Sequence, residues 1–370
     1  MRPDADHRGT ADAVIIGGGL VGLACAAALA RDGARSILLD DARPGAASTA
    51  AAGMLAPSVD REVGPAHDFA VAARDRYPAY LGWLTEATGI EVPINTAGIL
   101  QVAITARGVK GLRRSMPSNA GWIEQPALAE LEPSLSHALG AVMHSSDGAV
   151  DNVALVEALT SYCATSERIT THRVAASQLV PGGHGASVRT TNGSRFDAEF
   201  VVLAGGAWAS AIQGLPRPIP VSPARGQMLA FDPVPLRHVL FGPRGYIIPR
   251  SARADALAET LVGATTEQVG FDSGTTPSAA ATLQSVAAEI LPQLARSLPR
   301  RHWAGLRPMT PDLLPILGAD PGEPRLLYAC GHSRNGILMA PLTGDCISAL
   351  VRGEAPGLDL APFRVARFAA

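Results

Sequence analysis

The sequence predicts an α/β protein in which a parallel-sheet domain is interrupted by a second domain built on an antiparallel sheet (α+β). Three observations support this fold class. An uncharged run over residues 13–30 contains three consecutive glycines. Short, mainly apolar segments recur at residues 36–39, 200–203 and 326–329, as expected of buried parallel strands. Near Leu100 apolar side chains begin to alternate with smaller or polar ones, which indicates an antiparallel strand with one solvated face.

The composition excludes several classes of protein. Of the 370 residues, 47% are hydrophobic and 17% are charged, so the chain is not intrinsically disordered. The 31 basic and 33 acidic residues leave a net charge of −2, which argues against nucleic acid or an anionic membrane as a partner. The four cysteines have no CxxC spacing, and we expect buried thiols in a cytoplasmic protein, with no disulfide framework and no metal site.

The apolar run at residues 13–30 allows two interpretations. Its 18 residues reach the lower limit for a transmembrane helix, and it follows arginines, as the apolar core of a signal peptide would. Three consecutive glycines are unfavourable in either role. A buried strand at Ala13–Ile16, a glycine turn and a helix at Leu20–Arg31 explain the same residues better.

The strand–turn–helix carries a dinucleotide-binding motif. Gly17, Gly19 and Gly22 satisfy GxGxxG, in which the glycines allow a tight turn, close approach of a pyrophosphate and close packing of helix on strand. Asp40 ends the next predicted strand, Ser36–Leu39, where a carboxylate can accept a hydrogen bond from a ribose hydroxyl. The sequence therefore predicts a Rossmann-like domain, and at this stage FAD and NAD are equally compatible with it.

Further along the chain, the pattern indicates several crossings between two domains. We expect helices at residues 68–86 and 277–296, a helix capped by Asp151, and short strands at residues 227–231, 245–249 and 260–265. The proline-rich stretch 216–223 marks one crossing point. The expected nucleotide-binding domain comprises residues 1–85, 148–217 and 300–370, and the expected substrate domain comprises residues 86–147 and 218–299.

Seven motifs, in order, resemble one known family. They are GGGLVG with Asp40, STAAAGMLAP (48–57), RGQMLA (225–230), GYIIPR (245–250), LVGATTEQVGFD (261–272), WAGLRPMTPDLLPILG (303–318) and ACGHSRNGILMAPLTG (329–344). Together they resemble the D-amino-acid-oxidase-like FAD-dependent oxidoreductases, and most closely the glycine oxidases of the thiamine pathway. The resemblance covers residues 13 to about 350.

This resemblance implies FAD as the cofactor. Some relatives attach FAD through a cysteine shortly after the GLRP-like motif, whereas this chain has Met309, Thr310 and Pro311 there, so noncovalent FAD is expected. The cofactor-binding residues that it implies are Gly17, Gly19, Leu20, Val21, Gly22, Asp40, Asp41, Ala47, Ser48, Ala52, Gly53, Met54, Val174, His332, Ser333, Arg334, Asn335, Gly336, Ile337 and Leu338.

The resemblance also implies a site that binds the carboxylate of a small amino acid. Arg307 and Tyr246 match the residues that hold this carboxylate, Arg334 matches a second arginine, and Met54 matches the substrate-facing wall. A planar guanidinium binds a carboxylate bidentately, which supports the role of Arg307. Alternative roles remain for each residue. Arg307 could form a structural ion pair, Tyr246 could be a core aromatic residue, Arg334 could be a gate or a surface residue, and Met54 could only fill space in the core. Arg244, close to the site in sequence, adds a charge that bears on substrate preference.

The implied activity is oxidation of glycine, sarcosine or D-alanine by hydride transfer to flavin. The products would be glyoxylate or its imine, ammonia and H2O2, with O2 as the second substrate and a role in thiazole formation for thiamine. The alternatives are a D-amino-acid or sarcosine dehydrogenase with another electron acceptor, and a flavin-binding subunit without turnover. A homotetramer is the family expectation.

Overall fold

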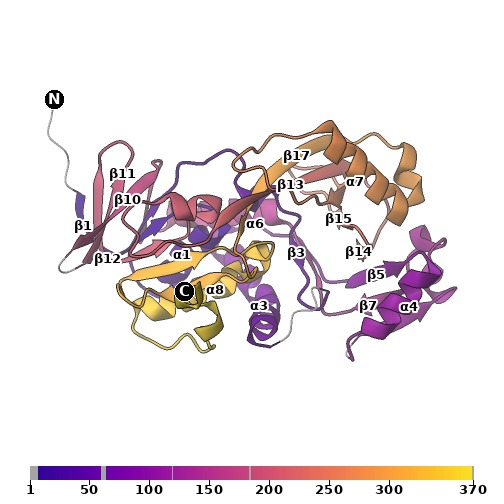
Figure 1. The fold of residues 1–370 in the computed structure, drawn as a ribbon, viewed down its shortest axis with the longest axis horizontal. Helices are drawn as coiled ribbons and strands as arrows, with labels where there is room; N and C mark the ends of the chain where they lie inside the picture. Colours follow the sequence, from indigo (N-terminus) through magenta and orange to yellow (C-terminus); the bar gives the residue numbers. More distant parts are fainter. Residues whose placement is uncertain (1–6, 60–63, 119, 183–184, 369–370) are drawn as a thin grey trace.

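The computed structural model describes residues 7–59, 64–118, 120–182 and 185–368. Within these residues the chain forms two eight-stranded sheets and one three-stranded sheet. The two large sheets lie side by side along the long axis, with β10–β12 at one end and β5, β7 and α4 at the other (Figure 1). This arrangement confirms the predicted α/β class with a second, mainly antiparallel sheet.

The first sheet has the order β10-β11-β12-β1-β2-β9, and β19 pairs with both β12 and β18. The strands β19, β12, β1, β2 and β9 are parallel to one another, whereas β18 pairs with β19 and β11 pairs with β12 in the antiparallel direction. The apolar segments predicted as strands lie next to one another here. The strands are β1 (His7–Ile16), β2 (Ser36–Leu39), β9 (Ile169–His172), β10 (Ala176–Gly182), β11 (Gly185–Thr190), β12 (Arg195–Leu203), β18 (Ile316–Ala319) and β19 (Leu326–Cys330).

Four helices form the main core with one face of this sheet; three of them contact its strands, and the fourth, α3, packs on α6 and α8. They are α1 (Leu20–Arg31), α3 (Pro65–Thr88), α6 (Asn152–Thr165) and α8 (Gly336–Val351). The predicted cap of α6 is confirmed, because the Asp151 carboxylate accepts from the backbone N–H groups of Val153 and Ala154. Helix α1 lies close to the strand before it: a Cβ on Gly22 would lie 1.8 Å from the Gly17 carbonyl oxygen, so only glycine fits.

The second sheet has the order β17-β13-β16-β15-β14-β5-β7-β6. Helix α7 (Pro277–Ile290) packs on one face, and the other face looks toward the nucleotide-binding part of the chain. The strands are β5 (Ile99–Ala103), β6 (Gly121–Glu124), β7 (Gly140–His144), β13 (Ser222–Phe231), β14 (Val239–Phe241), β15 (Tyr246–Arg250), β16 (Glu259–Gly263) and β17 (Arg301–Met309).

Three sequence predictions about this second domain differ from the structure. Strand β17 pairs with β13 along its length, although the expected boundary at residue 300 placed it with the nucleotide-binding pieces. Strand β5 is buried on both faces more than expected: Leu100 belongs to the cluster that contains α7, Ile99 belongs to the cluster between the domains, and Gln101 is only partly exposed. The helix expected to reach residue 296 ends at Ile290, and the 3₁₀ turn Pro292–Arg296 follows because Pro292 lacks the N–H that would continue the helix.

The remaining elements are short. Strands β3 (Met54–Leu55), β8 (Gly148–Val150) and β4 (Ile94–Asn95) form the three-stranded sheet between the two large ones. The short helices are α2 (Ala47–Ala50), α4 (Ala106–Ser115) and α5 (Ala127–Leu131), with 3₁₀ turns at Pro133–Leu135, Gly206–Ala211, Ala361–Phe363 and Val365–Phe368. All four cysteines are free and buried, as predicted. Among the helices of the described ranges, none has both the length and the apolar character needed to span a membrane.

Candidate functional site

The glycine turn, the start of α1 and Asp40 meet at the carboxyl edge of the first sheet. Gly19 is the N-cap of α1 and has no side chain to cap the first turn. The backbone N–H of Leu20 donates to Ser48 Oγ at 2.9 Å, which brings the 47–54 loop to this helix end. The Asp40 Oδ1 accepts from the N–H of Gly18 at 3.3 Å. A tight glycine turn, a helix N-terminus and a carboxylate beyond the second strand fit the pyrophosphate and ribose of a dinucleotide.

Asp41 and Val174 lie at the same edge. The exposed Asp41 carboxylate pairs with Arg43, whose guanidinium lies 5.5 Å from the Trp208 ring centre. Val174 follows β9, the strand next to β2, and its backbone N–H donates to the His172 carbonyl oxygen at 3.0 Å. The structure thus brings both residues to the side of the sheet where Asp40 lies.

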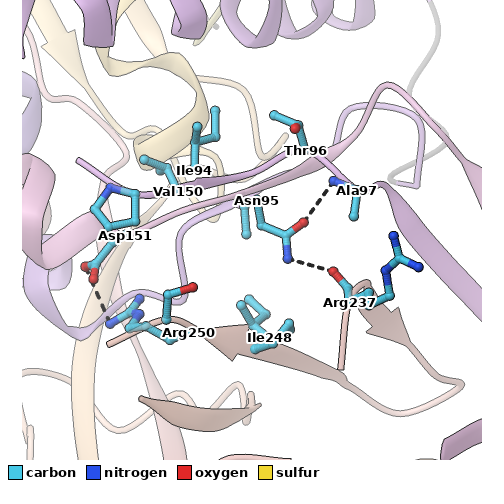
Figure 2. Close-up of a pocket in the computed structure, with 13 residues that line it drawn as sticks. Ile94, Asn95, Thr96, Ala97, Val150, Asp151, Arg237, Ile248 and Arg250 are labelled. Carbon is cyan, nitrogen blue, oxygen red and sulfur yellow. Dashed lines mark hydrogen bonds and ion pairs between the residues drawn. The ribbon is translucent and has the colours of Figure 1, made fainter. Parts of the chain in front are cut away.

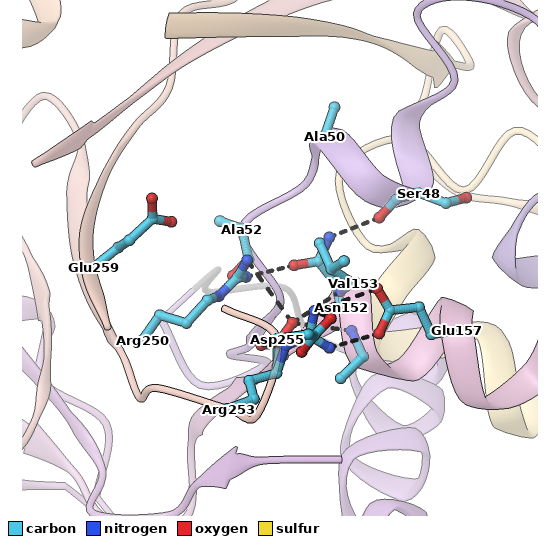
Figure 3. Close-up of polar contacts among 12 residues, drawn as sticks. Ser48, Ala50, Ala52, Asn152, Val153, Glu157, Arg250, Arg253, Asp255 and Glu259 are labelled. Atoms are coloured by element: carbon cyan, nitrogen blue, oxygen red, sulfur yellow. Dashed lines mark hydrogen bonds and ion pairs between the residues drawn. The ribbon is translucent and has the colours of Figure 1, made fainter. Parts of the chain in front are cut away.

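The 47–54 loop is fastened by two residues that our sequence analysis did not single out, Asn152 and Arg250. The Asn152 side-chain amide donates to the Ser48 carbonyl oxygen at 2.7 Å. Arg250, at the end of β15, donates to Asn152 Oδ1 at 2.6 Å and to the Ala52 carbonyl oxygen at 3.4 Å (Figure 3). These bonds join the first-domain loop to the second-domain sheet, and no motif spacing in the sequence indicates them.

The turn after β19 carries the predicted residues 332–338. The Ser333 N–H donates to the Pro308 carbonyl oxygen at 2.9 Å, so this turn is joined to β17 immediately after Arg307. His332 is buried, its Nε2 lies 3.1 Å from Thr343 Oγ1, and burial lowers the pKa of the imidazole to about 4. Arg334 is exposed, and helix α8 begins two residues later at Gly336.

Arg307 and Tyr246 lie on the same face of the second sheet, which we call the site face: Arg307, Gly226, Met228, Gly263 and Tyr246. Side chains alternate along each strand, and the registers pair Ala224 with Arg307, Met228 with Gly263, and Gly263 with Tyr246. Met228, Gly263 and Tyr246 therefore form a row across β13, β16 and β15. Arg307 shares this face but lies four residues along β17 from Trp303, the partner of Met228, and its side chain extends over Gly226.

Two glycines leave space for the side chains of Arg307 and Tyr246. A Cβ on Gly226 would lie 2.4 Å from the guanidinium carbon of Arg307, so the guanidinium occupies the space above this glycine. A Cβ on Gly263 would lie 2.7 Å from the Tyr246 ring. Sequence reasoning did not assign either glycine a role in the site, although both lie within the quoted motifs RGQMLA and LVGATTEQVGFD.

The environment of Arg307 and Tyr246 suits recognition of an anion. Arg307 Nη1 donates to the Thr265 carbonyl oxygen at 2.8 Å, which fixes one edge of the guanidinium. Burial raises the pKa of the Tyr246 hydroxyl, and the Arg307 guanidinium opposes this rise, so the hydroxyl stays neutral and can donate. Met54 packs in the same apolar cluster as Tyr246 and Met228.

Arg244 does not belong to the site face. Its guanidinium donates to Glu289 Oε2 and Ser285 Oγ on α7, at 2.7 and 3.0 Å, and its side chain is half exposed. The charge that the sequence places near Tyr246 is therefore directed to the helix on the opposite side of the sheet.

A separate cavity of about 330 Å³ lies between the three-stranded sheet and the end of β15 (Figure 2). Its lining includes Asn95, Asp151, Arg237, Ile248 and Arg250, and none of the predicted site residues. Asn95 bonds the backbone of Ala97 and Arg237, and Arg250 is engaged by Asn152. We assign no ligand to this cavity because these polar side chains are used within the fold.

Comparisons with known proteins agree with this geometry. Residues 12–350 match the family described as FAD dependent oxidoreductase. The bifunctional protein ThiO/ThiG of Synechocystis sp. is 38% identical, with 92% of this chain and 52% of that protein aligned, so this chain spans about half the length of that relative. The glycine oxidase of Geobacillus kaustophilus is 33% identical over 96% of this chain and 97% of that protein. Its crystal structure superposes with a TM-score of 0.89, covering 97% and 99% of the two chains at 31% identity.

Removing the Asn152 amide tests whether the 47–54 loop belongs to the cofactor site. We expect Asn152→Ala to raise the Kd for FAD about tenfold, since it removes hydrogen bonds to the Ser48 backbone and to the Arg250 cation, together worth about 1.5 kcal/mol. The measurement is a titration of apoprotein with FAD, followed by quenching of flavin fluorescence. Glu157→Gln is the control, because Glu157 pairs with the exposed side of Arg253. Equal affinity in wild type and Asn152→Ala would contradict this role.

Proposed function

Because the chain belongs to the family of FAD-dependent oxidoreductases, we propose that it uses noncovalent FAD to oxidise glycine and similar small amino acids, including sarcosine and D-alanine. The observation that carries this proposal is that Arg307 and Tyr246 share the site face, with the Arg307 guanidinium seated above Gly226. The reaction converts glycine, O2 and water into glyoxylate, or its imine before hydrolysis, with ammonia and H2O2.

Arg307 is proposed to bind the substrate carboxylate. Thr265 engages Nη1, and the guanidinium also interacts with the Tyr246 hydroxyl. A guanidinium has five N–H donors, so the remaining donors can meet both oxygens of a carboxylate. Tyr246 adds a neutral hydroxyl donor beside it. With the carboxylate fixed at two points, the amine and the Cα–H take one orientation, which is the main contribution that the protein needs to make.

FAD supplies the acceptor for the hydride that leaves Cα. No strong base is needed once the amine is unprotonated, and His332 is unsuited to that role because it is buried, neutral and placed beside Thr343. Met54 and Met228 give the site apolar walls that exclude water. Arg334, at the surface beside α8, is proposed to act near the entrance.

The residues that we propose to hold FAD come from all three nucleotide-binding pieces of the chain. Noncovalent binding is supported by Cys330, which is buried in β19 and whose thiol has a pKa raised to about 12 by burial. The proposed set is Gly17, Gly19, Leu20, Val21, Gly22, Asp40, Asp41, Ala47, Ser48, Ala52, Gly53, Met54, Val174, His332, Ser333, Arg334, Asn335, Gly336, Ile337 and Leu338.

The proposed biological role is the supply of the glycine-derived imine for thiazole formation in thiamine synthesis. Its support is the similarity to ThiO/ThiG and to glycine oxidases. A homotetramer belongs to the same proposal. The alternatives are a dehydrogenase that uses another electron acceptor, and a flavin-binding subunit that lacks turnover.

Anaerobic flavin reduction separates these possibilities. We expect the purified yellow protein to lose its flavin absorbance when glycine is added without oxygen, and to consume O2 while producing H2O2 when air is admitted. Bleaching without O2 consumption would favour the dehydrogenase. A yellow protein that glycine, sarcosine and D-alanine all fail to bleach would favour the subunit and contradict the proposal.

Substitution of Arg307 tests the carboxylate anchor. We expect Arg307→Ala to raise the half-saturating glycine concentration at least about 30-fold, since loss of a charge-assisted bidentate contact costs about 2 kcal/mol or more. FAD content should be retained, because Arg307 lies on the second-domain sheet. Arg244→Ala is the matched control, since that guanidinium bonds α7 instead. Unchanged steady-state kinetics in Arg307→Ala would remove Arg307 from substrate binding.

A further inference from the structure

The segment that follows β16 runs next to the Arg307 guanidinium and contacts it through Thr265. Thr265 supplies the carbonyl oxygen that accepts from Arg307 Nη1, and the same residue pairs with β13 from its other side. The Gln227 N–H donates to Thr265 Oγ1 at 2.9 Å, and the Thr265 N–H donates to the Gln227 carbonyl oxygen at 3.3 Å. The position of the carbonyl that holds Arg307 is therefore set by whatever fixes Thr265 and its neighbours.

Glu267 is the centre of that attachment. Its carboxylate accepts from three side chains: Thr265 Oγ1 at 2.6 Å, Gln227 Nε2 at 2.8 Å and Arg225 Nη2 at 2.7 Å. Its backbone also pairs with that of Arg225 in both directions at 2.9 Å. Burial would raise the pKa of this carboxyl, but the hydrogen bonds from Thr265, Arg225 and Gln227 bring it below its ordinary value, so it is ionised.

The carboxylate does not lie on the site face. Arg225 and Gln227 alternate along β13 with Gly226 and Met228, so their side chains point to the opposite side of the sheet from Arg307. Gln227 also accepts from the backbone N–H of Thr276, the N-cap of α7. Glu267 is thus connected to the guanidinium through Thr265, whose side chain it binds and whose carbonyl Arg307 contacts.

We propose that Glu267 is a positioning residue for Arg307, which orients the guanidinium by fixing the Thr265 carbonyl. The inference rests on the proposed role of Arg307 as the carboxylate anchor. A guanidinium recognises a carboxylate through a planar fork, so a small rotation about its axis misaligns both hydrogen bonds. Loss of the Glu267 charge therefore weakens carboxylate binding although Arg307 and FAD remain in place.

The test is the affinity of the FAD-loaded protein for acetate, a carboxylate without an oxidisable amine, measured from the change in flavin absorbance. We expect Glu267→Gln to raise the Kd for acetate about tenfold. Removing a residue that orients a ligand-binding side chain typically weakens binding by about 10-fold to 100-fold, and we expect the lower end of this range. Asp272→Asn is the matched control: Asp272 is 61% exposed and pairs with the same Arg225 at 2.7 Å, but it does not contact Thr265 in the structure. The control should stay within about twofold of wild type.

Two further variants make the result specific. Thr265→Val removes the hydroxyl that donates to Glu267 but keeps the carbonyl that accepts from Arg307, and it should weaken acetate binding in the same direction. In an Arg307→Ala background, Glu267→Gln should have no additional effect on acetate affinity, because the two residues act through one contact. Thermal stability and FAD content, measured for every variant, show whether the fold is retained.

The outcomes distinguish the positioning role from the proposed function. If Arg307→Ala weakens acetate binding and both Glu267→Gln and Thr265→Val leave it unchanged, the positioning role is overturned while the anchor stands. Additive effects of Glu267→Gln and Arg307→Ala also overturn it. If Arg307→Ala itself leaves acetate affinity unchanged, the proposed function fails.

Discussion

The structure of the site depends on one contact, the Arg307 guanidinium seated against the bare backbone of Gly226. Any side chain at position 226 would occupy the volume of the guanidinium. Arg307 pairs with Ala224 on β13, and its guanidinium extends over Gly226 on the face that also carries Met228, Gly263 and Tyr246. The half-buried guanidinium is held on one side by the Thr265 carbonyl, and we propose that a substrate carboxylate binds on the other.

The second requirement is that the two domains meet beside this contact. Nearly every predicted cofactor residue lies on a loop or helix end of the first domain, whereas Arg307 and Tyr246 belong to the second sheet. The domains are joined at both sides of the site, by Arg250 and Asn152 near Ser48, and by the Ser333–Pro308 backbone bond. These hydrogen bonds hold the proposed flavin-binding loops in a fixed position relative to the site face.

Local patterns were sufficient for the first strand, turn, helix and second strand of the nucleotide-binding domain. Buried parallel strands are continuously apolar, and GxGxxG specifies its own turn, so residues 13–40 could be predicted almost residue by residue. The assignment of Arg307 and Tyr246 required the motif resemblance, because nothing local distinguishes them from other arginines and tyrosines. Three features could not be predicted because they depend on contacts between distant segments. They are the pairing of β17 with the second sheet, the burial of both faces of β5, and the ion pair of Arg244 with α7. Asn152, Arg250 and Glu267 were missed for the same reason, since each acts through a backbone carbonyl or a neighbouring side chain.

The central claim is that Arg307 and Tyr246 together bind the carboxylate of the substrate. A crystal structure of the FAD-loaded protein with bound acetate tests it most directly. The account predicts that both acetate oxygens lie within hydrogen-bond distance of the Arg307 guanidinium, that one also accepts from the Tyr246 hydroxyl, and that Arg307 keeps its bond to the Thr265 carbonyl. Acetate bound elsewhere, for example beside Arg250 in the separate cavity, with Arg307 making no contact to it, would contradict the account.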